Sequence, residues 1–211
     1  MSKANKSNKA IKYRLYPNDE QKVMFAKTFG CCRFVYNQLL ALQKQRYKDG
    51  ESHLSKLKSN EFATRTLKKD YDFLKEIDKF AVSNAVFHLA DAYDRFFKKQ
   101  NHFPKFKSKR KSKKSYTTNF TNNNILIGKN VIKLPKVGMV KAVIHKLPKD
   151  DWKLKSVTVS QDSVGNYFAS VLFEYEQEDI PSVSKSSTNA IGLDYKSDGL
   201  YMDSNGNKAG V

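Results

Sequence analysis

The stretch FKKQNHFPKFKSKRKSKKSYTTNFTNNN, residues 97–124, most constrains how this chain can fold, because helical periodicity stops and strand periodicity begins within it. It is also the most basic part of the chain, with nine Lys and Arg and no Asp or Glu between residues 98 and 114. Such a block repels itself unless it neutralises a polyanion. The run is therefore either a solvated, disordered lysine-rich linker or a nucleic-acid contact.

Aromatic and amide side chains beside the basic run favour the nucleic-acid interpretation. Phe103 and Phe106 lie within it, Tyr116 and Phe120 supply stacking faces, and the polar residues 121–124 supply amide donors and acceptors. Nucleic-acid binding combines phosphate neutralisation with contacts to bases. The residues expected to contact the phosphate backbone are Lys105, Lys107, Lys109, Arg110, Lys111, Lys113 and Lys114.

The composition of the whole chain indicates the same class of partner. The 39 Lys and Arg against 21 Asp and Glu give a net charge of +18, which favours anionic partners. No stretch approaches the roughly 18 consecutive apolar residues of a membrane-spanning helix, so we expect no membrane partner. Cys31 and Cys32 are adjacent and no Cys/His ligand spacing occurs, so we expect buried packing cysteines, a reducing cytoplasm and no zinc site.

Helical patterns fill residues 18–99 and predict a helical hairpin or small bundle. A capping box at Asn18 opens the region, and apolar residues then recur at steps of three or four. Gly30 is expected to divide this first run into two helices. A weakly capped helix is predicted to start near Ser59, and a stronger one covers about residues 79–99.

Short strand patterns flank the helical region on both sides. Residues 1–9 are polar and expected to be mobile, whereas apolar alternation predicts a strand at residues 11–15. The first strand has no local partner, so we expect it to pair with the later strands. The result is an α+β fold, a small β-barrel with an inserted helical bundle. The later strands are predicted at residues 125–127, 131–134, 139–144, 154–160 and 167–176, with a hairpin turn at Gly165-Asn166.

The last part of the chain has the composition of a linker followed by a new strand. Residues 177–188 are rich in Glu, Asp, Pro and Ser, and an apolar strand then ends in Asp194 before a hairpin at residues 199–206. A strand that delivers an aspartate and then a hairpin begins the RNase H-like nuclease fold, in which this aspartate binds divalent metals. The alternative is a turn-capping aspartate.

Seven segments stand out in this order along the chain: KYRLYPNDEQ, KTFGCCRFVYNQLL, IDKFAVSNAV, FPKFKSK, SYTTNFTNNN, KLPKVGMVK and IGLDYKSDGLYMDSNG. In their order and at their separations they closely resemble the TnpB proteins of bacterial insertion sequences. Those transposon-encoded proteins are relatives of type V CRISPR effectors and are also described as OrfB-type transposases with a helix-turn-helix. The resemblance covers residues 10–211.

The resemblance implies a wedge-like barrel, a helical recognition insertion and a RuvC-like nuclease domain. It also implies a guide RNA held in a basic groove, and a double-stranded target DNA recognised through a short flanking motif, in the bacterial or archaeal cytoplasm at the nucleoid. The corresponding boundaries are residues 1–17 for the first barrel strand, 18–100 for the helical insertion, 101–178 for the basic stretch and remaining barrel strands, 179–189 for a linker and 190–211 for the start of the nuclease domain.

The resemblance carries over the motif-reading residues by position. Phe80 is equally a candidate for core packing, and Ser55 and Ser83 stand where some relatives have larger polar or aromatic side chains. Lys79 is better placed, because a charge beside an apolar helix face must reach water or phosphate. The residues implied to read the flanking motif are Ser59, Lys79, Phe80, Ser83, Thr121 and Asn122.

Asp194 matches the first catalytic aspartate of the family, which is also a metal ligand there. The sequence ends 17 residues later, before the second and third carboxylates and the zinc ribbon of the family, so we expect Mg²⁺ only where the nuclease domain is completed. Two hypotheses remain: a nuclease-inactive module that binds guide RNA and target DNA, or part of an active RNA-guided endonuclease whose C-terminal half is missing or separately encoded. A helix-turn-helix DNA binder that needs no RNA is a third, for which the helical spacing gives no specific argument.

Overall fold

The computed structural model describes residues 5–177, 191–195 and 200–209. The chain divides into two compact units, Met1–Gln177 and Glu178–Val211, and each is described here by itself. The linker expected at residues 179–189 lies outside the described residues.

The first unit is built on a seven-stranded sheet in which every described pairing is antiparallel. The hydrogen-bonded order is β2-β6-β7-β1-β5-β4-β3, so β2 and β3 each have one partner strand in this sheet. The described pairings therefore form an open series. The strands are β1 (Asn5–Tyr16), β2 (Lys114–Asn119), β3 (Leu126–Ile127), β4 (Val131–Leu134), β5 (Gly138–Val143), β6 (Lys153–Gln161) and β7 (Tyr167–Gln177).

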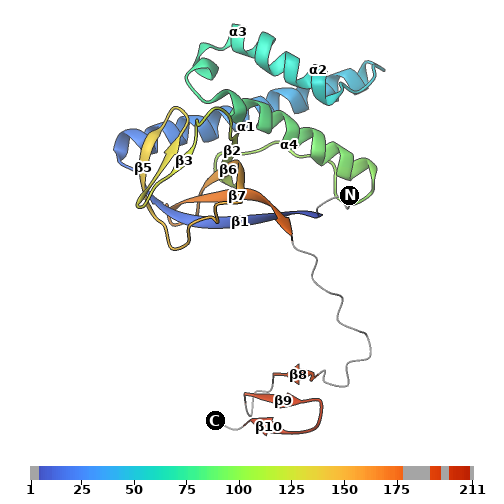
Figure 1. Ribbon diagram of the computed structural model, residues 1–211. Coiled ribbons are helices and arrows are strands. Elements are labelled where there is room, and N and C mark those ends of the chain that lie inside the picture. Colours follow the sequence, from blue (N-terminus) through green and yellow to red (C-terminus); the bar gives the residue numbers. More distant parts are fainter. Residues whose placement is uncertain (1–4, 178–190, 196–199, 210–211) are drawn as a thin grey trace. The chain divides into compact units, whose positions relative to one another are not determined.

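The first strand organises this sheet, as its lack of a local partner predicts. β1 pairs with β7 from Asn5 to Leu15 and with β5 from Arg14 to Tyr16, and Figure 1 shows β1 running beside β7 below the helices. The helices are thus an insertion between β1 and β2. One expectation for this region is wrong: the strand begins at Asn5, so residues 5–9 are not mobile but pair with β7.

The insertion contains two long helices joined by shorter helical segments. The capping box predicted at Asn18 is present, but Gly30 does not divide the first helix, because burial of residues on both sides of it outweighs the cost of about 1 kcal/mol for a helical glycine. The second helix is capped by Ser55, not by Ser59. The elements are α1 (Asp19–Lys48), α2 (Lys56–Glu61), a π-helical turn (Phe62–Leu67), α3 (Lys68–Asp70), a 3₁₀ turn (Asp72–Lys75) and α4 (Lys79–Phe97).

The core packs the inner face of the sheet against α1 and α4. Phe25 and Phe29 on α1 contact the ring of Tyr116 from β2, and Phe25 also stacks on Tyr167 from β7. Buried and partly exposed residues alternate along β7, and the residues that point inward are buried. The buried residues of β1 and β7 are Ile11, Tyr13, Leu15, Tyr167, Ala169, Val171 and Phe173.

The adjacent cysteines belong to this core, as expected. Cys31 and Cys32 are both buried on α1, and burial raises the pKa of the Cys31 thiol to about 11 and that of the Cys32 thiol to about 12. Both side chains remain protonated near neutral pH and pack as small apolar groups. None of the described helices is both long enough and apolar enough to cross a membrane.

The second unit contains three short antiparallel strands in the order β10-β9-β8. They are β8 (Leu193–Asp194), β9 (Tyr201–Asp203) and β10 (Lys208–Ala209). Asp194 pairs through its backbone with Met202, which places it at the end of a strand as the sequence predicts.

Candidate nucleic-acid interface

The basic run is attached to α1 by a two-point clamp. Asn37 Nδ2 donates to the carbonyl oxygen of Lys107 at 2.9 Å, and the Lys107 amide donates to Asn37 Oδ1 at 2.8 Å. Four residues earlier, the Phe103 ring packs edge-on against Tyr93 and Phe96 of α4. The segment therefore follows a fixed path along the two long helices, which contradicts its interpretation as a disordered linker.

Beyond the clamp, a compact turn presents three consecutive cations. The Ser108 amide donates to Ser112 Oγ at 2.9 Å, and the amide of Lys111 donates to Ser108 Oγ at 3.0 Å. These bonds close the turn while its side chains at Lys109, Arg110 and Lys111 stay exposed. Among the described residues no carboxylate forms an ion pair with the basic run. The turn is thus a preorganised cluster of positive charge.

Lys107 differs from the other cations of the run. Its Nζ lies 4.1 Å from the centroid of the Tyr36 ring, and partial burial lowers the pKa of its ammonium group. It therefore contributes to fixing the segment on α1 through a cation–π contact. The exposed members of the predicted phosphate-contacting set are Lys105, Lys109, Arg110, Lys111, Lys113 and Lys114.

One predicted stacking residue does not face solvent. The Tyr116 ring is 3% exposed, and burial raises the pKa of its hydroxyl well above the ordinary value. It alternates inward on β2 and packs in the core, so the expectation of a stacking face there is wrong. The other candidate rings are accessible, with Phe103 40%, Phe106 54% and Phe120 37% exposed.

The start of α4 is joined to the end of β2 by buried hydrogen bonds. Asp78 caps α4 by accepting from the Ala81 amide at 3.2 Å, and the same oxygen accepts the hydroxyl proton of Thr118 at 2.7 Å. One turn later, Asn84 Nδ2 donates to the Thr117 carbonyl at 2.9 Å. Helix and strand are therefore held in one relative position.

The loop after β2 is equally well defined. The Thr121 amide donates to Asn124 Oδ1 at 2.8 Å, and Asn124 Nδ2 donates to the Asn119 carbonyl at 3.0 Å. Asn122 and Asn123 take the left-handed conformation, with φ of 46° and 56°, which asparagine tolerates better than most residues. This turn leaves the Asn122 side chain exposed.

Most of the predicted motif readers lie on these two connected elements. Lys79, Phe80 and Ser83 occupy the first turns of α4, with the Lys79 Nζ 5.0 Å from the Phe80 ring centroid. Lys79 is exposed, whereas Phe80 and Ser83 are half-buried. Thr121 and Asn122 follow β2. The structure therefore joins α4 and the β2 end through the bonds of Asp78 and Asn84.

Ser59 lies apart from this group. It is 6% exposed on α2, and its hydroxyl accepts a hydrogen bond from Gln43 Nε2 at 3.4 Å. A contact between Ser59 and a base edge would require α2 to move away from α1.

A second basic and aromatic cluster, which sequence reasoning missed, lies on the outward face of β1 and β7. Lys12 Nζ is 4.2 Å and the Arg14 guanidinium carbon 5.0 Å from the Phe168 ring centroid. Arg14 also donates to Asn166 Oδ1 at 2.5 Å. The alternation of Lys12 and Arg14 with buried Tyr13 was the available signal.

Other supporting residues gave weaker signals. Asp78 precedes a helix start, where aspartate is a preferred cap, so its role could have been read from the sequence. Asn37 and Asn84 lie within helical runs, and no local sequence pattern indicates that their side-chain amides bond to distant backbone groups.

The described residues do not fit a two-metal centre on their own. Asp194 is exposed, and the Asp203 carboxylate is already engaged by the Asn205 and Asn207 amides and the Asn207 side chain. Within the described ranges no group of three or more His, Cys, Asp or Glu is arranged to hold a metal ion. Two divalent ions need several carboxylates, so Asp194 would require ligands other than these.

Comparison with known proteins matches these observations to one family. A model described as a helix-turn-helix domain, that of OrfB proteins of the IS605 type, matches residues 7–52. The chain is 30% identical over 202 residues to a protein of Streptomyces pristinaespiralis proposed to be an RNA-guided DNA endonuclease, over 95% of this chain and 49% of that protein. It is 29% identical over 192 residues to InsQ of Escherichia coli K12, with the same proposed activity, over 88% of this chain and 44% of InsQ.

The domain match and both relatives agree. The chain belongs to the TnpB family. The properties of this family include DNA binding, transposition and association with insertion sequences. The chain spans about half the length of these two TnpB-family relatives. It is also 32% identical over 111 residues to the virulence protein VsdF of Salmonella dublin, over 48% of this chain and 93% of VsdF.

The helix-turn-helix description does not match the local geometry. Residues 7–52 contain most of β1 and the single, uninterrupted helix α1. A helix-turn-helix needs two helices joined by a short turn. The family match therefore identifies the chain, while the structure assigns a strand and one helix to the matched residues.

Proposed function

We propose that the first unit binds an RNA guide and double-stranded target DNA through the basic run and the connected α4–β2 elements. The observation that carries this proposal is the clamp between Asn37 and Lys107. It holds a segment rich in exposed cations in one conformation, and ordering such a segment in advance lowers the cost of binding a polyanion. The names of the TnpB-family relatives support RNA and DNA as the two partners.

Within this proposal, the α4 start and the β2 end read the motif beside the target. Lys79 supplies a phosphate contact, and Asn122 supplies an amide with both donor and acceptor groups, the arrangement that reads base edges. The buried bonds of Asp78 and Asn84 support the assignment, because they fix the spacing between the two elements.

We also propose that the sheet forms the wedge-like barrel of the family. Beyond β2, the Phe120 amide donates to the Lys155 carbonyl at 2.9 Å, and residues of β3 and β6 line one hollow of about 690 Å³. Curvature that brings β3 and β6 to the same hollow supports a barrel with one open seam.

For the second unit, we propose an RNase H-like start in which Asp194 binds Mg²⁺ together with carboxylates beyond those described. A metal ion held there would polarise a phosphodiester and activate water. The first unit would then bind nucleic acid, and cutting would occur only where those carboxylates are supplied.

The direct test is to express the chain with its native flanking DNA, purify it and sequence the RNA that co-purifies. Enrichment of one RNA from the adjacent transposon end is expected. Recovery of random RNA fragments only would refute guide binding.

A second candidate function, part of an RNA-guided endonuclease, is favoured by the position of Asp194 at the end of β8. It predicts magnesium-dependent cutting of target DNA when a nuclease segment with the missing carboxylates is added in trans. Continued inactivity with intact binding would favour the binding module.

A further inference from the structure

A hollow of about 570 Å³ lies between the C-terminal ends of α1 and α4, away from the motif-reading elements. Its polar lining residues are few: Gln43, Lys44, Lys48 and Glu51. Six ring-bearing side chains supply the rest, namely Tyr47, His53, Tyr93, Phe96, Phe97 and Phe103.

Five of these rings form one connected cluster, and Tyr47 is a sixth ring lining the same hollow. His53 packs edge-on against Tyr93 with centroids 4.5 Å apart, and Phe103 meets Tyr93 nearly at right angles. Yet Phe97 is 64% and Tyr47 84% exposed. Large aromatic surfaces left together in water indicate a binding surface.

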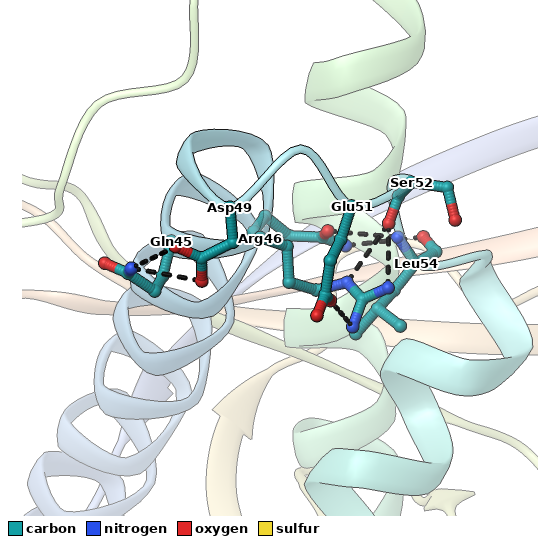
Figure 2. A network of polar contacts seen from close by, with 7 residues as sticks. Gln45, Arg46, Asp49, Glu51, Ser52 and Leu54 are labelled. Atoms are coloured by element: carbon teal, nitrogen blue, oxygen red, sulfur yellow. Dashed lines mark hydrogen bonds and ion pairs between the residues drawn. The ribbon is translucent and has the colours of Figure 1, made fainter.

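The loop that carries His53 is fixed from both sides. Figure 2 shows Arg46 donating to the Ser52 carbonyl and pairing with Glu51, with distances of 3.0–3.1 Å and 2.5 Å. On the other side, the Leu54 amide donates to Gln43 Oε1 at 3.0 Å. The hollow is therefore preformed. Burial lowers the pKa of the His53 imidazole from its ordinary value, which favours the neutral ring.

The unpaired charges that line the hollow are positive. Glu51 is neutralised by Arg46, whereas Lys44 and Lys48 form no ion pair among the described residues. Lys44 Nζ lies 5.9 Å from the Phe103 ring and 5.3 Å from the Phe106 ring. Since Phe103 and Phe106 lie within the basic run, the aromatic hollow continues directly into the cationic segment.

We propose that this hollow binds an unstacked base of a single-stranded nucleic acid whose phosphates follow the basic run. A flat aromatic ligand attached to a polyanion matches both the exposed rings and the lysines, whereas an apolar peptide matches only the rings. The volume of the hollow is sufficient for one nucleotide. The inference rests on the proposed nucleic-acid function and adds a site to it. Unpaired guide RNA and a displaced DNA strand share this chemistry.

The test compares the variants Phe97→Ala and Tyr47→Ala with the control Leu57→Ala, which removes an 81% exposed apolar side chain outside the hollow. Binding is measured by anisotropy with labelled 12-residue oligouridine and oligothymidine, and with a duplex of the same length. Both hollow variants are expected to weaken single-strand binding by about 5- to 100-fold, the range of base–aromatic stacking. Duplex binding and the control should stay within about two-fold.

The outcomes separate this site from the general function. Stronger loss with oligouridine identifies RNA as the source of the base, and stronger loss with oligothymidine identifies DNA. Equal loss for single strand and duplex, or no loss in either hollow variant, overturns the base pocket even where wild-type binding persists. A concentration-dependent dimer that Phe97→Ala abolishes would also overturn it, since a second copy would then cover the rings. Failure of the wild-type chain to bind any oligonucleotide refutes the proposed function itself.

Discussion

Replacing Asn37 by alanine should separate the order of the basic run from its charge. The variant loses both clamp bonds to Lys107, each worth about 0.5–1.5 kcal/mol. RNA binding must then supply about 1–3 kcal/mol of free energy to order the basic run. The Kd for RNA should therefore rise by about 5- to 100-fold at constant salt. No cation is removed, so the slope of log K against log salt should stay the same.

Two measurements test this reasoning. Hydrogen exchange followed by mass spectrometry should show loss of protection around residue 107, and anisotropy titrations at several salt concentrations give both Kd and slope. Gln38→Ala, at the half-buried neighbouring amide, is the matched control and should leave both unchanged. An unchanged Kd despite lost protection would show that preorganisation of the run does not matter, and a shallower slope would show that the clamp acts through charge placement.

Three further outcomes are expected. Asp78→Ala should lower the free energy of unfolding by about 2–4 kcal/mol, from a lost cap and a lost buried bond, with a coupling of about 1–2 kcal/mol to Thr118→Val in a urea double-mutant cycle; additive effects would exclude the bond. Alkylation of Cys31 and Cys32 at pH 8 should be roughly 100-fold slower in the folded chain than in urea, because burial raises both thiol pKa values to about 11 and about 12; equal rates would contradict their burial. Asp194→Ala should change nucleic-acid affinity by less than about two-fold in anisotropy titrations, since a lone strand-end carboxylate contacts no phosphate favourably; a larger loss would place Asp194 in the interface.

Local signals predicted the parts of the fold that depend on neighbouring residues. The Asn18 capping box and the Gly165 turn both occur, because each is decided by backbone bonds within a few residues. The pairing of β1 with later strands could also be inferred, since a half-buried strand without a local partner must find a distant one.

Long-range packing accounts for the errors. β2 was not predicted, because its residues are mostly basic or hydroxyl-bearing and do not show apolar alternation. Only Tyr116 and Thr118 occupy buried, inward positions on this strand. Gly30 continues a helix that tertiary contacts hold together. Ser59 is buried by Gln43, a contact that helical spacing on one segment does not reveal.

The location of the candidate interface could be predicted from the charge of the sequence, but its three-dimensional shape could not. Sequence reasoning located the basic run correctly, yet gave no sign of the Asn37 clamp, because an amide that bonds to the backbone of residue 107 leaves no periodic pattern. It also missed the aromatic hollow, whose rings come from two stretches far apart in the chain, residues 47–53 and 93–103.

The most direct test of the account is the salt dependence of RNA binding when the turn at Lys109, Arg110 and Lys111 is changed to glutamine. The wild-type slope of log K against log salt should be about −3 to −5, and the triple variant should reduce its magnitude by about 2–3. Changing Lys129, Lys133 and Lys141 to glutamine removes the same charge from the β3–β5 region and should alter the slope by less than 1 by the same relation. Equal slopes for all three proteins would show that the basic run is not the nucleic-acid interface.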